Sequence, residues 1–219
     1  MDRTAVLQKI DRAAAEQSTQ LNLMMMELTE VPEEITQLKH LDTLILGHNQ
    51  INAIPDWIAQ LTDLNCLLLG SNRINLIPEL ISQLVNLQHL QCGDNQICII
   101  PDSIGQLENL QHLQLDYNQI SVIPESIGKL VHLQHLSLSN NQISQIPEAI
   151  AALKQLQNID LRSNKITIVP QSLAHMPKLK KLCLDNNPLF NVPPEIIRRG
   201  WGRRGLFQTQ LRGCDKQFT

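Results

Sequence analysis

Hydrophobic and polar positions follow one pattern that repeats every 23 residues along this chain. Each copy reads L-x-x-L-x-L-x-x-N-x-I-x-x-I-P-x-x-I-x-x-L-x-x, and residues 110–132 give one complete copy, LQHLQLDYNQISVIPESIGKLVH. The same step carries a proline and an asparagine from copy to copy. The prolines are Pro32, Pro55, Pro78, Pro101, Pro124, Pro147, Pro170 and Pro193, and the asparagines are Asn49, Asn72, Asn95, Asn118, Asn141, Asn164 and Asn187. A short fixed period indicates a solenoid, in which each copy packs on its neighbours.

The L-x-L part of each copy predicts a short β-strand, because its apolar residues alternate with period two and so share one buried face. Copies one step apart place these strands side by side in a parallel sheet, about 4.8 Å apart. The asparagine follows where the chain turns into the interior. Its carboxamide offers both donor and acceptor atoms, so we expect a ladder of asparagines that bonds the buried backbone of adjacent turns.

The Ile-Pro part predicts a helical return path. Proline suits the first position of a helical turn, and an acid follows it, as in Pro55-Asp56, which is favourable at a helix N-terminus. Ile127 and Leu130 then lie three residues apart, as expected for one apolar stripe on a short helix or 3₁₀ turn. The predicted fold is an α/β solenoid shaped like a horseshoe, with a parallel sheet on the concave side and short helices or 3₁₀ turns on the convex side.

A terminal repeat exposes its core and needs a cap. We expect residues 1–17 to supply a capping helix, residues 18–197 to form about eight turns, and residues 198–219 to form a basic C-terminal cap or tail. One side of the expected helix over residues 4–17 carries Val6, Leu7, Ile10, Ala13 and Ala14. The residues expected to seal the last turn are Phe190, Ile197, Trp201, Leu206 and Phe207.

Composition narrows the functional classes. The net charge is −3 and aromatics are only 3% of the chain, so nucleic acid is not an expected partner. Residues 174–219 are nevertheless basic, with 9 Lys and Arg against 3 Asp and Glu. No apolar run reaches the ~20 residues that span a membrane. Five scattered cysteines fit reduced thiols, so we expect a cytoplasmic location. The chain lacks a glycine-rich phosphate loop, H-E-x-x-H and G-x-S-x-G, so we expect neither an enzyme nor a cofactor.

This pattern resembles the leucine-rich repeat family over residues 18–197. It is most similar to the 23-residue intracellular type with I/L-P-x-x-I, found in Ras-associated repeat proteins and in the repeat arms of Roco proteins. The lead-in IDRAAAEQSTQLNL and the ending NPL…VPPEI are similar to bacterial versions of such arms. The resemblance implies a horseshoe that binds other proteins on its concave sheet, with a small GTPase as one expected partner. The chain departs from Roco proteins because it has no G-x-x-x-x-G-K-[ST].

The exposed x positions of the strands form columns across the predicted concave face. Ile45 and Leu68 fall near its N-terminal end, where strand residues facing solvent are usually polar, so they predict an apolar contact site. The alternative is that the cap helix covers them. The C-terminal end carries Arg162, Lys180 and Lys181, which suit an acidic partner.

The middle of the face is predicted to be polar. Tyr117, the only tyrosine, stands where an interface anchor is expected. The remaining candidate binding residues are His89, Gln91, His112, Gln114, Asp116 and His135.

The three histidines predict a ladder on adjacent strands. Neighbouring imidazoles could share Zn or Ni, with Asp94 or Asp116 adding oxygen. The alternative is that LQHL was copied together with its repeat, and we expect no metal. Three close imidazoles resist simultaneous protonation, so we also expect binding at this face to change below about pH 6.

These observations favour a non-enzymatic protein-interaction module, in intracellular signalling or as a scaffold. Two alternatives stay open at this point. One is the recognition arm of a larger enzyme, either a Roco-type GTPase or a ubiquitin-ligase effector. The other is a metal or ligand sensor that uses His89, His112 and His135.

Overall fold

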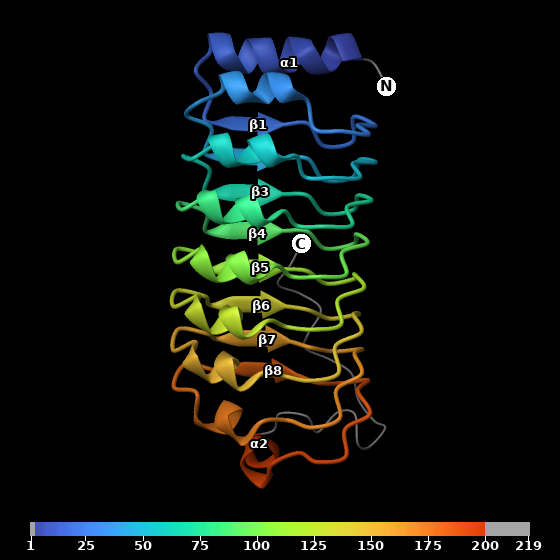
Figure 1. The fold of residues 1–219 in the computed structure, drawn as a ribbon, viewed down its shortest axis with the longest axis vertical. Helices are drawn as coiled ribbons and strands as arrows, with labels where there is room; N and C mark the ends of the chain where they lie inside the picture. Colours follow the sequence, from blue (N-terminus) through green and yellow to red (C-terminus); the bar gives the residue numbers. More distant parts are fainter. Residues whose placement is uncertain (1–2, 200–219) are drawn as a thin grey trace.

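In the computed structural model, which describes residues 3–199, short strands form one parallel sheet in chain order (Figure 1). The central residue of each strand is buried and, except at the buried Cys183 of the last strand, its two neighbours are more exposed, as the period-two pattern predicts. The strands are β1 (Gln20–Asn22), β2 (Thr43–Ile45), β3 (Cys66–Leu68), β4 (His89–Gln91), β5 (His112–Gln114), β6 (His135–Ser137), β7 (Asn158–Asp160) and β8 (Lys181–Cys183). Equivalent residues pair across the whole sheet, for example His89 with His112.

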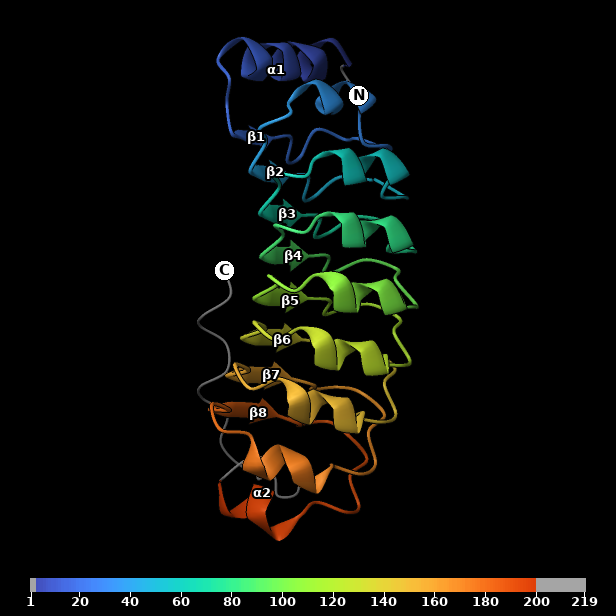
Figure 2. The same cartoon turned by 60° about the vertical axis from the view of Figure 1, so that its left-hand side comes forward.

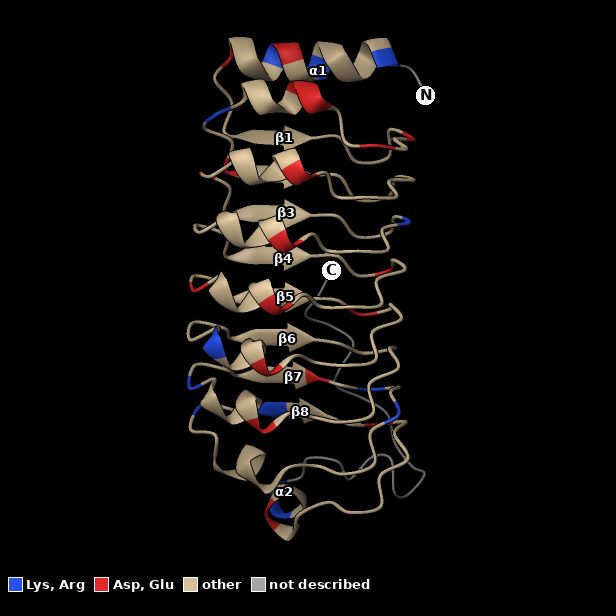
Figure 3. Cartoon of the chain, in the orientation of Figure 1, with Lys and Arg blue, Asp and Glu red and all other residues tan. Residues whose placement is uncertain are grey.

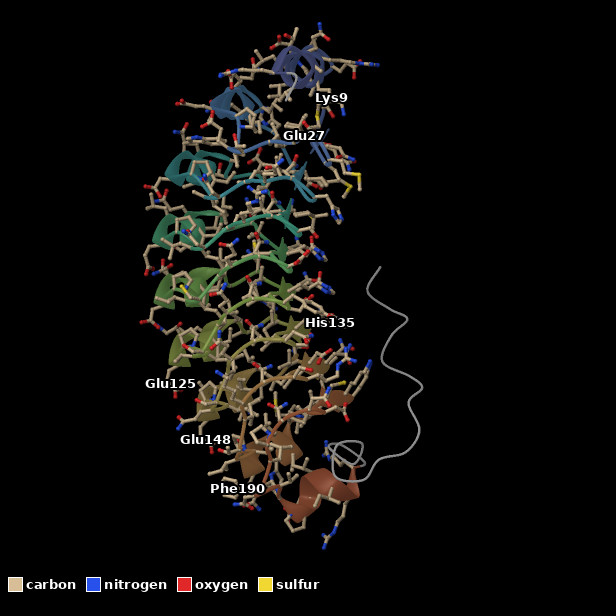
Figure 4. The ribbon with its side chains drawn as sticks, turned by 90° about the vertical axis from the view of Figure 1, so that its right-hand side faces the viewer. Lys9, Glu27, Glu125, His135, Glu148 and Phe190 are labelled. Atoms are coloured by element: carbon tan, nitrogen blue, oxygen red, sulfur yellow. The ribbon has the colours of Figure 1, made fainter. Side chains whose placement is uncertain are left out.

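The return path of each turn forms a 3₁₀ helix on the side opposite the sheet (Figure 2). These helices are η1 (Glu33–Gln37), η2 (Asp56–Gln60), η3 (Glu79–Gln83), η4 (Asp102–Gln106), η5 (Glu125–Lys129), η6 (Glu148–Ala152) and η7 (Gln171–His175). The stack bows so that the sheet lies on its inner side (Figures 2 and 4). The predicted class, an α/β solenoid with 3₁₀ turns on the convex side, is therefore confirmed.

Proline begins each 3₁₀ helix one position earlier than predicted. Pro124 is the N-cap of η5, with extended backbone angles, and not its first helical residue. Its carbonyl accepts the N–H of Ile127 at 3.0 Å. The prediction of a first-position proline was wrong because a five-residue 3₁₀ helix needs its first acceptor at the N-cap, where the restricted φ of proline fits as well.

The asparagine ladder joins the turns at the carboxyl ends of the strands. The Nδ2 of Asn118 donates to the carbonyls of Cys92 at 2.9 Å, Leu115 at 3.1 Å and Asp116 at 3.2 Å. Its Oδ1 accepts the N–H of Ile97 in the preceding turn at 2.9 Å. Equivalent bonds recur at Asn49, Asn72, Asn95, Asn141, Asn164 and Asn187. Each side chain thus pairs buried backbone groups of two turns, as the sequence predicts.

A second ladder, not predicted, runs along the amino ends of the strands. Each member after the first donates to the side-chain oxygen of its counterpart one turn earlier. The members are Asp42, Asn65, Gln88, Gln111, Gln134, Gln157 and Lys180. All the amides point the same way, so a carboxylate accepts at one end and an ammonium donates at the other, at 3.0 Å from Gln157. This arrangement ties the turns together beside the sheet.

The two described ends close the core differently. Helix α1 (Arg3–Ala15) buries Val6, Ile10 and Ala13 against the first turn. At the other end α2 (Pro194–Arg198) packs against η7 and buries Ile196. Phe190, expected to seal the last turn, is 75% exposed, and that expectation was wrong because Ile196 of α2 is the residue buried there. Trp201, Leu206 and Phe207, like the expected tail itself beyond residue 199, lie outside the described residues.

Within residues 3–199, no helix has both the length and the apolar character needed to cross a membrane.

Candidate functional site

The nine predicted binding residues all lie on the concave face of the sheet or at its edge. Their positions follow directly from the register of the strands. They are Ile45 on β2, Leu68 on β3, His89 and Gln91 on β4, His112 and Gln114 on β5, Asp116 and Tyr117 directly after β5, and His135 on β6. All are half-buried except Tyr117, which is exposed.

Tyr117 owes its exposure to a left-handed turn. Its φ is 53°, a region that costs an L-residue roughly 1–2 kcal/mol. Its N–H bonds the carbonyl of Ser139 in the next turn at 2.9 Å, which helps to hold this conformation. The turn aims Tyr117 outward and the following Asn118 inward. The same positive φ recurs at Met25, His48, Ser71, Asp94, Asn140, Ser163 and Asn186.

The three predicted histidines stack as parallel rings. The ring centroids of His89 and His112 lie 4.4 Å apart with planes inclined by 15°, and those of His112 and His135 lie 4.4 Å apart with planes inclined by 11°. The Nδ1 of His135 lies 2.8 Å from the amide nitrogen of Asn158. Since that nitrogen can only donate, Nδ1 accepts and carries no proton in this arrangement.

Burial favours the neutral form of two of these rings, His112 and His135. Burial lowers the pKa of His112 to about 4, with smaller contributions from His135 and His89. The pKa of His135 is also lowered, first by burial and then by the charge of Lys180. Protonation of His112 and His135, expected below about pH 6, is therefore shifted to lower pH, because the sheet partly buries both rings.

The metal alternative is not supported by the geometry. No three His, Cys, Asp or Glu side chains among residues 3–199 are arranged to hold a metal ion. Parallel stacking explains this, because rings that lie face to face do not direct their nitrogens to one point. Within residues 3–199 this geometry does not favour a sensor that binds metal through these histidines.

The apolar patch at the N-terminal end is less exposed than the sequence implied. Ile45 and Leu68 are half-buried, whereas Met24 and Met25 beside them are 39% and 69% exposed. The cap helix does not cover β2 or β3, since among the described elements α1 contacts only β1 and η1. Lateral packing between strands, and not the cap, shields the two aliphatic side chains.

A polar hollow of about 420 Å³ lies over the carboxyl ends of β4–β8. Its lining includes four of the predicted residues, Gln91, Gln114, Asp116 and Tyr117. Burial raises the pKa of Asp116, and the carboxylates of Asp160 and Asp94 raise it further, while hydrogen bonds from its own backbone and from Ser137 oppose these effects. The hollow therefore favours a ligand group that donates hydrogen bonds or carries positive charge.

The basic end of the face is more internally paired than expected. The guanidinium of Arg162 donates to the carboxylate of Asp160, with Nη2 2.6 Å from Oδ2 and Nε 3.0 Å from Oδ1. Lys180 donates to Gln157 at the end of the amide ladder. Arg162 therefore has an acceptor in its own turn and Lys180 has one in the preceding turn, so both cations are already bonded within the chain.

Sequence analysis missed a second exposed surface. Leu76, Ile99 and Val122 occupy the same position of three consecutive turns, just before the buried Ile of Ile-Pro, and are 51%, 58% and 66% exposed. The signal was present in the sequence, since the consensus leaves this position variable and here it is aliphatic three times in succession.

Three comparisons place this geometry among known proteins. A leucine-rich repeat region model matches residues 19–95 and 124–198, and a leucine-rich repeat model matches residues 86–143. Comparison with curated proteins gave no match.

Solved structures share the fold. A leucine-rich repeat protein of Leptospira interrogans is 32% identical, with a TM-score of 0.74, and the match covers 85% of this chain and 54% of that one. Internalin C2 of Listeria monocytogenes is 27% identical, with a TM-score of 0.77 and 86% of each chain covered.

A third match is the ectodomain of the Arabidopsis thaliana receptor kinase GASSHO1/SCHENGEN3, solved in complex with CASPARIAN STRIP INTEGRITY FACTOR 2. It is 33% identical, with a TM-score of 0.72, and the match covers 76% of this chain and 21% of that one. This chain spans only about half the length of the Leptospira protein. From its repeats, its fold and these matches, the chain belongs to the leucine-rich repeat family.

Proposed function

We propose that this chain is a non-enzymatic protein-binding module whose concave sheet face contacts the partner. One observation carries the proposal: the sheet register brings all nine candidate residues onto one continuous face beside a polar hollow. The scaffold beneath is bonded from turn to turn by two side-chain ladders, so it loses little conformational entropy on binding. Leucine-rich repeat proteins generally serve as interaction modules, which supports the same conclusion.

The face offers three kinds of contact. Ile45 and Leu68 present half-buried apolar surface on β2 and β3. On β4–β6 the histidine rings present a flat surface, and Tyr117, directly after β5, supplies an aromatic anchor at the rim of the hollow. Aromatic side chains at such positions commonly dominate interface energetics. A partner that is apolar at one end and rich in hydrogen-bond donors at the other fits this arrangement.

We further propose a cytoplasmic signalling or scaffold role, with a small GTPase as a partner and the Ras-related or Roco-like repeat class as its group. The support is the I/L-P-x-x-I repeat and the reduced cysteines inferred from their spacing. Service as the recognition arm of a larger enzyme is the second candidate, and it is supported by the greater length of the solved relatives.

The test is affinity capture from a lysate of the source cells, read by quantitative mass spectrometry. The concave variant is Ile45→Asp/Leu68→Asp/Tyr117→Asn, in which Asn is chosen because it occupies the same left-handed position at 140 and 186. The matched control is Val85→Asp/Val131→Asp, since these valines are 54% and 49% exposed but lie in loops outside the sheet. Partners lost only with the concave variant support the proposal, and partners retained by it contradict the proposal.

A further inference from the structure

An exposed aliphatic row runs along the loops that connect the strand ends to the 3₁₀ helices, on the right of Figure 1. We define the aliphatic row as Ala53, Leu76, Ile99 and Val122, which are one repeat step apart. The last three are each more than half exposed. Consecutive large aliphatic side chains on the surface of a stable fold mark an interaction site more often than isolated ones.

An acidic row lies beside the aliphatic row, three residues further along each turn. We define the acidic row as Asp56, Glu79, Asp102, Glu125 and Glu148, all exposed at the start of a 3₁₀ helix (Figure 3). Glu125 and Glu148 point away from the molecule on the side opposite His135 (Figure 4). None of the five forms an ion pair with another described residue. Their charge is therefore available to a partner.

A hollow of about 420 Å³ continues the aliphatic row toward the N-terminus. It lies between α1 and the first two turns, and Ala53 lines it together with Val31 and the half-buried Trp57. Glu30 and Glu33, the latter one step before Asp56, lie at its edge, whereas the nearby Glu34 is paired with Arg3 at 3.2 Å. The hollow thus joins an apolar floor to an acidic rim, and it can receive one bulky apolar side chain.

We propose that this flank binds a basic amphipathic helix of another protein. Successive turns of the stack are about 4.8 Å apart at the sheet and wider on the outer arc, which matches the 5.4 Å rise of one helical turn. An extended segment repeats its side chains every ~6.6 Å and falls out of step. Apolar residues of the helix contact the aliphatic row, a bulky one enters the hollow, and Lys or Arg on the adjoining face meet the acidic row.

The charges of the acidic row disfavour two other occupants of this flank, a second copy of the chain and an anionic lipid surface. A symmetric dimer joins the same patch of two copies and brings one acidic row against another. An anionic lipid surface is likewise repelled by the acidic row. The inference does not depend on the concave site, because the two surfaces share no residue.

The experiment selects binders to the complete chain from a displayed library of random 16-residue peptides, followed by fluorescence anisotropy with the peptides recovered. The expected peptides carry apolar residues at i, i+4 and i+7 with Lys or Arg on an adjoining face. Ile99→Glu/Val122→Glu should weaken their binding by about tenfold or more. Glu79→Lys/Asp102→Lys/Glu125→Lys should abolish it and select acidic peptides instead.

Val85→Glu/Val131→Glu is the matched control, since it adds the same charges at valines on the opposite edge of the stack and should leave the affinity unchanged. Circular dichroism confirms that every variant is folded. The inference is overturned if no peptide is selected, if the selected peptides lack the basic amphipathic pattern, or if the flank substitutions leave binding intact. A dimer seen by sedimentation that Ile99→Glu/Val122→Glu dissociates would also overturn it, in favour of a second copy.

Discussion

The concave face and the aliphatic row are built by the same 23-residue step, yet they present aliphatic side chains to water very differently. Ile45 and Leu68 on the face are half-buried, whereas Ile99 and Val122 in the row are 58% and 66% exposed. Neighbouring strands stand close together in the sheet, so each side chain shelters the next. The loops of the aliphatic row have no such lateral packing.

The exposure of a side chain therefore does not follow simply from its being at a variable position of the repeat. A variable position in the strand is partly a packing position, and a hydrophobic residue there gains stability from its neighbours. A hydrophobic residue at a variable loop position gains little stability from its neighbours. Three large aliphatic residues in succession there therefore indicate a binding surface. The predictions below test this contrast, from the largest expected effect to the smallest.

The largest effect is expected from Asn118→Leu, which disrupts the scaffold that both surfaces share. It leaves the N–H of Ile97 buried without a partner and removes one of the two donors to the carbonyl of Cys92, which Asn95 also bonds. The free energy of unfolding should fall by about 3 kcal/mol. Urea denaturation followed by circular dichroism measures the change. Asn75→Leu, at an exposed asparagine outside the ladder, is the control and should change stability by less than ~0.5 kcal/mol.

Glycine substitutions should differ between the convex and concave sides. A Cβ added at Gly105, in η4, would lie 2.5 Å from the carbonyl oxygen of Ser126 in the next turn. Gly105→Ala should therefore destabilise the chain by about 1–3 kcal/mol. A Cβ at Gly47, on the concave side, meets its nearest atom at 3.3 Å, and Gly47→Ala should cost less. Equal losses in thermal unfolding would contradict the close approach of η4 and η5.

The contrast itself is tested by Leu68→Ser and Ile99→Ser. Leu68→Ser removes half-buried surface and should cost about 1 kcal/mol, while Ile99→Ser should cost less than ~0.5 kcal/mol. Chemical denaturation of both variants gives the comparison. A larger loss at Ile99 would show that the aliphatic row packs within this chain, and it would remove the argument for a partner there.

The last effect concerns pH and is confined to the concave face. The pKa of His112 in the folded chain, about 4, is below its ordinary value of 6.5, so the unfolded chain takes up the proton first as pH falls. This contribution to stability is complete above pH 6.5 and declines between pH 6.5 and about 4. His112→Gln/His135→Gln should flatten the loss measured between pH 7 and 5, whereas His132→Gln, at an exposed loop histidine, should not.

Much of the fold could be predicted because its strongest interactions repeat with the sequence. The strands, the Asn118-type ladder and the 3₁₀ helices each depend on one residue kind at one position of the copy. The predicted start of the helix at Pro124 was wrong by one residue, because sequence preferences for proline do not distinguish an N-cap from a first helical residue. Phe190 was misplaced because the last turn departs from the pattern.

The candidate residues could be placed on the concave face from the sequence, but their chemical environment could not. That His89, His112 and His135 are neighbours follows from the period, whereas their parallel stacking depends on ring orientation. The lowered pKa values of His112 and His135 depend on burial. The pairing of Arg162 with Asp160 also depends on side-chain direction. The aliphatic row was not predicted because the repeat pattern does not show how exposed a variable loop position is.

The most direct test of the central claim is the affinity of a captured partner, measured by isothermal titration calorimetry against three forms of the chain. They are the native chain, Ile45→Asp/Leu68→Asp/Tyr117→Asn on the concave face, and Val85→Asp/Val131→Asp outside it. A protein-binding concave face predicts that the first variant loses about tenfold or more in affinity while the second keeps native affinity. Native affinity in the concave variant would contradict the claim.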